Sequence, residues 1–173
     1  MGSLFQDQNR YPEAKANYEQ CLRILEASFG RKHMDVASAL HHLAAVNQLQ
    51  GLYNEAIPLY NRALDIYYEL LGPVHADIAL SLNDVAILYF KQGNHKKAEE
   101  YYLKSIDNYT QVFTRVHPDV AQALLNIAQF YKATGQVPNA KKYYQESVEI
   151  FTQTLGASNP RTLNAIASAK TLK

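Results

Sequence analysis

The stretch YYELLGPVHADIALSLNDVAILYFKQGNHKKAEEYY, residues 67–102, decides the fold, because it holds two helical patterns joined by short turns. Gly72-Pro73 and Gly93-Asn94 mark the turns, since glycine and proline interrupt helices. On both sides of Gly93, apolar residues recur at steps of three and four, which is the spacing of one face of an α-helix. The stretch therefore predicts two consecutive amphipathic helices with a tight turn between them.

The same pattern recurs along the chain at a fixed interval, the one that separates His33 from His75, with no insertion or deletion. His117 stands one such period after His75, and Asn159 stands one period after His117. A fixed period of about 20 to 50 residues is the signature of repeat proteins, in which each unit buries its apolar face only against its neighbours. The sequence therefore predicts a stack of similar helix pairs. The other columns in register are Ala14, Ala56, Ala98 and Ala140; Tyr18, Tyr60, Tyr102 and Tyr144; Gly51, Gly93 and Gly135; and Leu40, Leu82 and Leu124.

Capping residues indicate where the helices begin and end. His117-Pro118 and Asn159-Pro160 place a polar residue before a helix and proline at its first position, where the missing N–H costs no hydrogen bond. Glycine after the last apolar turn ends a helix. We expect an all-α fold, a right-handed superhelical solenoid of antiparallel helix pairs, with about three full repeats plus a leading and a trailing helix. The expected helices span 12–29, 34–50, 54–71, 76–92, 96–113, 118–134, 138–155 and 160–172.

Composition limits the classes of partner and compartment. The 173 residues, 47% of them hydrophobic, suffice for a single domain over residues 1–173. The 17 basic and 16 acidic side chains nearly cancel, so we expect binding to neither nucleic acid nor membrane. The lone Cys21, the missing secretory signal and the absence of a long apolar run favour a cytoplasmic location. Residues 1–3 resemble a cloning remnant, and we expect the chain to be a fragment of a longer protein.

The histidines are interpreted as structural residues. Equivalent positions of stacked helices lie on the order of 10 Å apart, whereas the ligand atoms of one zinc ion lie about 2 Å from it. His33, His75 and His117 are therefore expected to cap helices and not to share a metal ion. His41 and His42 are adjacent on a helix and point in different directions, so they do not favour a metal site either.

The sequence favours a protein without catalytic activity. Nucleophilic catalysis needs a serine or cysteine beside a base and an orienting group. Cys21 stands one period before Ala63 and is predicted to pack in a column of small residues. No phosphate-binding glycine motif occurs, so the glycines are interpreted as helix stops. We expect neither an enzyme nor a cofactor-binding protein.

The small and aromatic columns resemble the tetratricopeptide repeat. Ala86, Tyr89, Ala98 and Tyr102 carry the likeness, and the stretch LGPVHADIALSLNDVAILYFKQG is similar to the longer repeats of kinesin light chains and of scaffolds such as nephrocystin-3. The period exceeds the family's usual length of about 34 residues by about one turn per helix. The resemblance extends over essentially the whole chain and implies a protein-binding domain in which the first helix of each pair lines a concave groove.

The predicted groove is nearly uncharged. Asparagine and glutamine side chains both donate and accept hydrogen bonds, so they suit the backbone of an extended peptide. Leu80, Ile87 and Leu125 suit apolar side chains of that peptide. We therefore predict an interaction scaffold that binds a peptide segment of a partner protein, such as a cargo adaptor of the kinesin light chain kind. The residues predicted to form the surface of this groove are Ser38, His41, His42, Leu80, Asn83, Asp84, Ile87, Lys91, Gln122, Leu125, Asn126, Gln129 and Lys132.

Two modes of peptide recognition that the resemblance implies are matched only in part. The clamp for a C-terminal carboxylate uses lysine, arginine and asparagine, and only Asn126 fits it here. Kinesin light chains use an asparagine pair and basic groove residues for acidic cargo, whereas Asp84 is expected to repel an acidic peptide. Protonation of His41 and His42 below about pH 6.5 is expected to strengthen the binding of acidic ligands.

Two other functions stay open at this point. Repeats of this length also accompany nucleotide-binding switch domains, so the chain could be the sensor segment of a signalling protein. Self-assembly is the second alternative, because exposed repeat ends stack and residues 4–9 resemble the tail of another helix. Lys170 stands in the column of Ala44, Ala86 and Ala128, which predicts a polar capping helix that limits self-association at that end.

Overall fold

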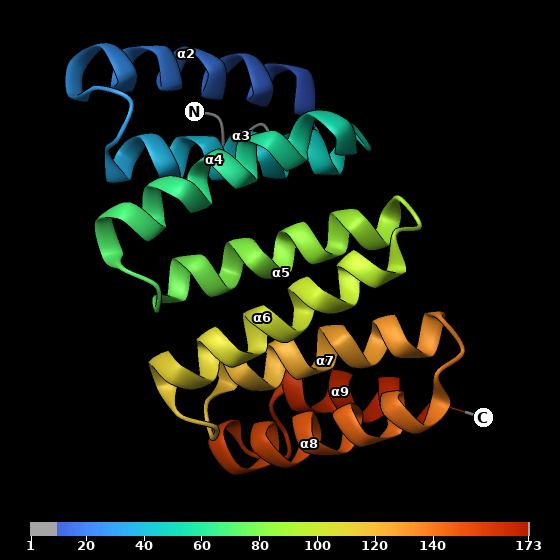
Figure 1. The fold of residues 1–173 in the computed structure, drawn as a ribbon. Coiled ribbons are helices and arrows are strands. Elements are labelled where there is room, and N and C mark those ends of the chain that lie inside the picture. The colour runs from blue at the N-terminus through green and yellow to red at the C-terminus, as the bar shows by residue number, and fades with distance from the viewer. Residues whose placement is uncertain (1–9, 173) are drawn as a thin grey trace.

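The computed structural model describes residues 10–172, so the expectation for residues 4–9 lies outside the described residues. Within this range the chain forms eight α-helices and no strand, and each helix packs mainly against the helices next to it in sequence. Figure 1 shows the resulting stack, which is the predicted solenoid of antiparallel helix pairs. The helices are α2 (Tyr11–Phe29), α3 (Met34–Leu49), α4 (Tyr53–Leu71), α5 (Ala76–Lys91), α6 (His95–Phe113), α7 (Pro118–Ala133), α8 (Val137–Leu155) and α9 (Pro160–Lys170).

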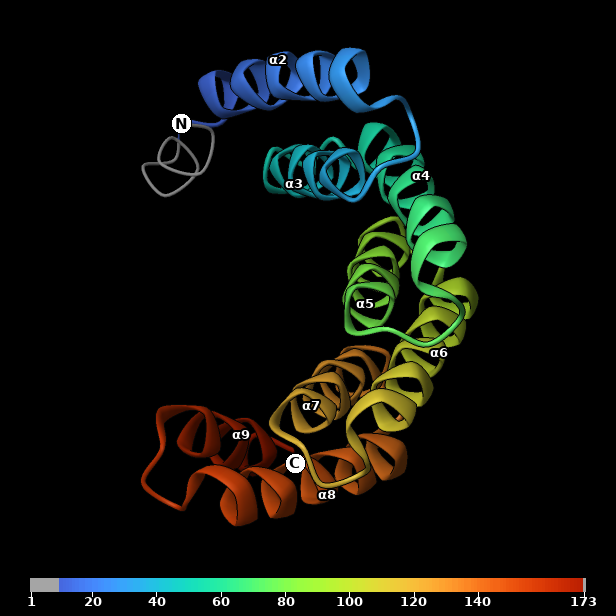
Figure 2. The same cartoon turned by 90° about the vertical axis from the view of Figure 1, so that its left-hand side faces the viewer.

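The stack is curved, with a different set of helices on each side. Figure 2 shows α3, α5, α7 and α9 along the inside of the curve and α2, α4, α6 and α8 along the outside. The first helix of each pair therefore lines the concave face, as predicted. The observed helix bounds lie close to the expected ones, and the largest difference is at the end of α9. None of the described helices combines the length and apolarity that a membrane span requires.

Histidine side chains begin three of the inner helices. The Nδ1 atoms of His33, His75 and His117 each accept the backbone N–H of the aspartate two residues later, at 3.2 Å. These bonds satisfy one of the N–H groups that the start of a helix leaves without a partner. The predicted capping role is confirmed. Within residues 10–172 no group of three or more potential ligand side chains could hold a metal ion.

The repeat columns form a continuous core. Small residues allow neighbouring helices to approach closely, and the tyrosines fill the seams between repeats. Ser105 and Ser147 tie the two helices of a pair together, because each Oγ donates to a carbonyl of the inner helix, that of Ala79 or Ala121, at 2.7 Å. The columns that are at most 4% exposed are Ala44, Ala86 and Ala128; Ala14, Ala56, Ala98 and Ala140; and Tyr60, Tyr102 and Tyr144.

Cys21 departs from this pattern. It occupies the position of Ala63, Ser105 and Ser147, which are all buried, yet its side chain is exposed. The equivalent serines pack against the inner helix of their own pair. No such helix is described before α2, so the expectation that Cys21 is packed was wrong.

The residues that follow the outer helices share a backbone conformation. Gly30, Gly72 and Gly156 have φ between 80° and 87°, and Thr114 stands in the same column with φ 72° and ψ 167°. Side chains other than glycine rarely adopt this region, because the backbone clashes with Cβ. Thr114 therefore carries local strain that its glycine counterparts avoid.

Asn108 fastens the loop between α4 and α5. Its Nδ2 donates to the carbonyl of Pro73 at 2.7 Å, and its Oδ1 accepts the N–H of His75 at 3.1 Å. The side chain is 7% exposed, so both bonds are shielded from water. Because Ile66 and Ile150 occupy the equivalent positions, this polar fastening is particular to one loop.

Candidate functional site on the concave face

Two equivalent pockets open on the concave face, one repeat apart. The first lies between α5, α6 and α7 and has a volume of about 210 Å³, and the second lies between α7, α8 and α9 and has a volume of about 590 Å³. Gln129 lines both pockets and so forms the wall between them. The first pocket is lined by Ile87, Phe90, Lys91, Tyr102, Asn126, Gln129 and Phe130. The second is lined by Gln129, Lys132, Ala133, Tyr144, Ala167, Ser168 and Thr171.

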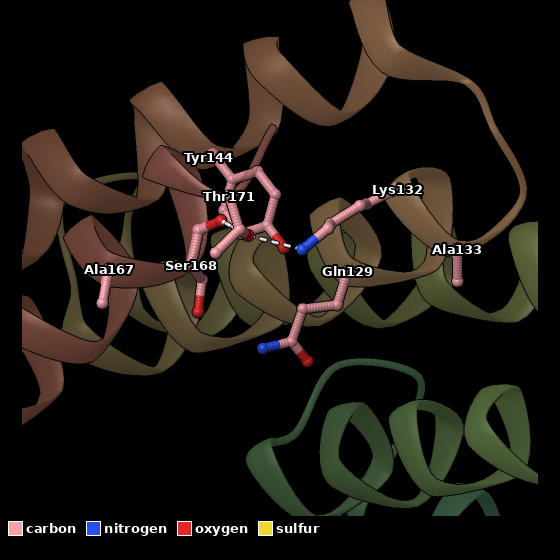
Figure 3. Close-up of a pocket in the computed structure, with 7 residues that line it drawn as sticks. All are labelled: Gln129, Lys132, Ala133, Tyr144, Ala167, Ser168 and Thr171. Atoms are coloured by element: carbon pink, nitrogen blue, oxygen red, sulfur yellow. Dashed lines mark hydrogen bonds between the residues drawn. The ribbon is translucent and has the colours of Figure 1, made fainter. Parts of the chain in front are cut away.

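The two pockets differ in chemistry. In the first, the rings of Phe90 and Phe130 meet edge to face at 5.5 Å, so the interior is aromatic with Lys91 among the lining residues. In the second, Lys132 takes the place of Phe90. Figure 3 shows its ammonium group beside the hydroxyl of Thr171, with which it forms a hydrogen bond, and near Tyr144. The first pocket therefore offers an aromatic wall beside Lys91, and the second offers the ammonium group of Lys132 beside alanine, serine and tyrosine side chains.

A row of hydrogen-bonded side chains runs across α5, α7 and α9. Asn126 donates through Nδ2 to Oδ1 of Asn83 at 2.9 Å, and Gln122 donates through Nε2 to Oδ1 of Asn126 at 3.1 Å. Arg161 extends the row by donating to Oε1 of Gln122 at 3.4 Å. These amides satisfy one another, so they serve the contact between repeats as well as the surface.

Two of the predicted groove residues are buried. Asn83 is 7% exposed and Leu125 is 2% exposed. Asn83 faces the neighbouring inner helix through its bond to Asn126, and Leu125 packs into the core around α7. The expectation that these two side chains are exposed was wrong, because adjacent inner helices cover the positions that face the next repeat.

A second polar cluster joins α3 and α5. His41 contacts Ser81 through Nδ1, with Oγ 3.2 Å away, and Asp84 through Nε2, with Oδ2 3.4 Å away. Serine, histidine and carboxylate in this order are the groups of a nucleophilic triad. Ser81 is completely buried, however, so its hydroxyl is not accessible to a substrate. The cluster therefore acts as a polar contact between repeats.

Burial governs the charges of this cluster. It raises the pKa of Asp84 to about 7 and lowers the pKa of His41 to about 4, and the pKa of His42 is lowered for the same reason. Hydrogen bonds from Asn83 and Tyr60 offset the effect on Asp84 only in part. Two sequence expectations are corrected. The pKa of His41 lies at about 4 and that of His42 is lowered, and Asp84, partly protonated near neutral pH and turned toward His41, is a weak source of repulsion in the groove.

These shifts link stability to pH in opposite directions. Above about pH 4 the unfolded chain releases the Asp84 proton that the folded chain keeps up to about pH 7, so this group lowers the free energy of unfolding as pH rises through that range. The pKa of His41 is depressed, so between about pH 4 and 6.5 the unfolded chain binds the extra proton and the free energy of unfolding rises with pH. The two effects oppose each other below pH 6.5, and Asp84 alone acts near pH 7.

The other predicted groove residues do not all line the same pocket. Leu80 is 42% exposed and lines neither concave pocket, whereas Ser38 and His42 line another pocket, of about 270 Å³, between α2 and α3. Sequence reasoning missed the residues that α9 contributes. The repeat period could have found them, because Ala167, Ser168 and Thr171 follow predicted groove positions or their neighbours by one period. The predicted residues that line the two concave pockets are Ile87, Lys91, Asn126, Gln129 and Lys132.

Solved structures of kinesin light chain repeats have a fold similar to that of this chain. The kinesin light chain nearly identical TPR-like repeats from Podosopora anserina share 23% identity with this chain and a TM-score of 0.81, with 97% of this chain and 80% of that chain covered. A variant of the same protein has a TM-score of 0.82, again at 23% identity, and the match covers 97% of this chain and 79% of that chain. BtubC (BKLC) from P. vanneervenii has a TM-score of 0.77 at 15% identity, and the match covers 99% of this chain and 76% of that chain. At these identities the likeness concerns the fold.

Comparison at the level of sequence identifies the family. The family model described as tetratricopeptide repeat matches residues 1–69, 35–111 and 119–169. No curated protein matches the chain. Since the family model covers most of the chain and the similar structures are kinesin light chain repeats, the chain belongs to the tetratricopeptide repeat family, with a fold of the kinesin light chain type.

Proposed function

We propose that this protein is a cytoplasmic adaptor of the kinesin light chain kind, whose concave face binds an extended peptide segment of a partner protein. Tetratricopeptide repeats form protein interaction scaffolds and generally bind protein partners. The observation that carries the finer proposal is the pair of equivalent pockets that share Gln129. The inaccessible Ser81 hydroxyl supports a role without catalysis.

The spacing of the pockets fits an extended chain. Successive inner helices meet through side chains such as Asn126 and Asn83, so equivalent points on them lie on the order of 10 Å apart. In a polyproline II conformation residues i and i+3 point to the same side and lie about 9 Å apart. A peptide of this kind places one side chain in the aromatic pocket beside Lys91 and a polar or acidic side chain beside Lys132.

A peptide-display selection tests the proposal. The protein is screened against a random library, and the selected peptides are measured against Gln129→Trp, which fills the shared wall of both pockets. Gln20→Trp, an exposed substitution on α2 that lines neither pocket, is the matched control. We expect the selected peptides to carry an apolar and a polar residue three positions apart and to lose binding only with Gln129→Trp. Equal binding to both variants would refute the groove. Circular dichroism establishes that both variants are folded.

Self-association is the second candidate, and one observation favours it. Ile24 and Phe29 on α2 are 57% and 54% exposed, and Cys21 is exposed as well, so α2 presents apolar surface at one end of the described stack. At the other end Lys170 is exposed in the column of buried alanines, which makes α9 more polar. Light scattering over a range of concentrations distinguishes the two candidates, because a monomeric peptide binder keeps a constant mass.

A further inference from the structure

The unpaired positive charge of this molecule is concentrated on one edge. Within residues 10–172, seven exposed lysines form no ion pair with a carboxylate within 4.0 Å, and Arg23 is the one other basic residue of that range in the same condition. The lysines lie at the turns between α5 and α6 and between α7 and α8, and at the end of α9. Figure 1 shows these turns and the C-terminal end together on the right-hand edge. We call this surface the lysine edge: Lys91, Lys96, Lys97, Lys132, Lys141, Lys142 and Lys170.

The stability of the helices does not account for these lysines. The N-terminus of a helix carries a partial positive charge and favours acidic residues. Helices α2 and α4 follow this rule, with Glu13 and Glu55 in their first turns. Helix α6 has no acid in its first turn and carries Lys96 and Lys97 there, and the first turn of α8 also lacks an acid. The charge on this edge therefore opposes local stability.

The repeat does not account for them either. The positions equivalent to Lys97 hold Glu55 and Asn139, so the lysine edge is not a column of the repeat. Of the nearest carboxylates along the chain, Glu99 accepts the hydroxyl of Tyr131 at 2.6 Å, and Glu100 pairs with Lys104 at 2.7 Å and also interacts electrostatically with Lys96 and Lys97. Seven of the 17 basic side chains lie on this edge without an ion-paired carboxylate, and the net charge of +1 for the whole chain does not show this local excess.

We propose that the lysine edge is a docking surface for an acidic segment of a partner polypeptide. Its seven cations are all lysines, whose separate ammonium charges, each with three donors, can pair with successive carboxylates of an acidic chain. The aromatic rings nearby are not free for base stacking, because Lys97 covers Tyr89 at 4.9 Å and Lys142 covers Tyr143 at 5.4 Å. Among the exposed large apolar side chains of the described residues, Val137 at the start of α8 lies beside these lysines in the sequence, which is too little apolar surface for insertion into a membrane.

This surface is distinct from the proposed groove and meets it only at Lys91 and Lys132, which line the two concave pockets. A partner peptide could therefore use both, with its apolar and polar anchors in the pockets and an acidic flank on the edge. The inference about the edge does not require the groove to bind, because Lys96 and Lys97 line neither concave pocket.

Binding of a fluorescent oligoglutamate peptide of about twelve residues tests the proposal by anisotropy at low and at physiological salt. The test variant is Lys96→Glu with Lys97→Glu. The control is Arg23→Glu with Lys32→Glu, which changes the net charge equally and lies off the edge. We expect the test variant to weaken binding by about tenfold or more and the control by less than about twofold, with binding of the unmodified protein weaker at higher salt. The test variant should melt no lower than the unmodified protein, because glutamate suits the first turn of α6.

Several outcomes would overturn the proposal. These are the absence of oligoglutamate binding at low salt, equal losses in both variants, and tighter binding of a single-stranded oligonucleotide or of phosphatidylserine vesicles than of oligoglutamate. The Gln129→Trp variant separates this proposal from the groove. It should keep its affinity for oligoglutamate, and a loss there would assign the binding to the groove instead.

Discussion

Replacing Thr114 with glycine should stabilise the protein. A residue other than glycine in this backbone region costs of order 1–3 kcal/mol, and Thr114 has φ 72° and ψ 167° where its counterparts in the column are glycines. Glycine gives back roughly 0.5–1 kcal/mol through the greater freedom of the unfolded chain. The net gain from Thr114→Gly is therefore about 1 kcal/mol, which corresponds to a rise in Tm of roughly 2–4 °C for a chain of this size.

Urea denaturation followed by circular dichroism measures this gain, with Gly72→Thr as the reverse control. An added Cβ at Gly72 meets no atom within 4 Å, so the control introduces backbone strain without a steric clash. We expect Gly72→Thr to lower the free energy of unfolding by about 1 kcal/mol, because the backbone strain and the unfolded-chain freedom then act with opposite signs. The reasoning fails if Thr114→Gly leaves the free energy of unfolding unchanged or lowers it while Gly72→Thr does not change it. That result would mean that a side chain at these positions does not strain the backbone.

Three further changes follow from the described contacts. Asp84→Asn removes a buried carboxyl whose pKa is raised to about 7. The substitution should therefore raise the free energy of unfolding at pH 8 by up to ~4 kcal/mol and change it little at pH 4. Urea denaturation at both pH values measures this difference. Asn108→Ala leaves the Pro73 carbonyl and the His75 N–H without their partner and should cost about 1–3 kcal/mol, and a neutral result would contradict the fastening of that loop. His117→Ala removes a helix cap and should cost about 1 kcal/mol in the same assay, whereas Gln153→Ala, an exposed change on α8, should cost much less.

The fold was predictable from the sequence because its signals are local and repeated. His75 and Gly93 set the start and the end of one inner helix, and the same residue types reappear one period later in His117 and Gly135. An uninterrupted period fixes the pairing of helices, since each unit can bury its apolar face only against the next.

The fine structure of the concave face was less predictable. Whether an inner residue faces the groove or the next repeat depends on how each helix is rotated and how closely neighbours approach, and these are properties of packing. Asn83 and Leu125 were therefore expected to be exposed and are buried. The contact of His41 with Ser81 and Asp84 joins residues close to one period apart, so the period could have indicated that they are neighbours.

The lysine edge was hidden from the sequence for a different reason. A net charge summed over the chain contains no information about position, and the lysines do not follow the repeat. The excess becomes visible in the structure, where seven lysines without an ion-paired carboxylate lie at turns that share one edge.

The uninterrupted period of this chain has a consequence for ligand alignment. A solenoid with identical units has translational symmetry, and an extended ligand could shift by one unit without any change in binding energy. The exchange of Phe90 for Lys132 and of Asn126 for Ser168 at equivalent positions removes that degeneracy. A ligand with one apolar side chain for the aromatic pocket and one acidic side chain for Lys132 would therefore have a single lowest-energy alignment. Its chain direction along the stack would be fixed as well.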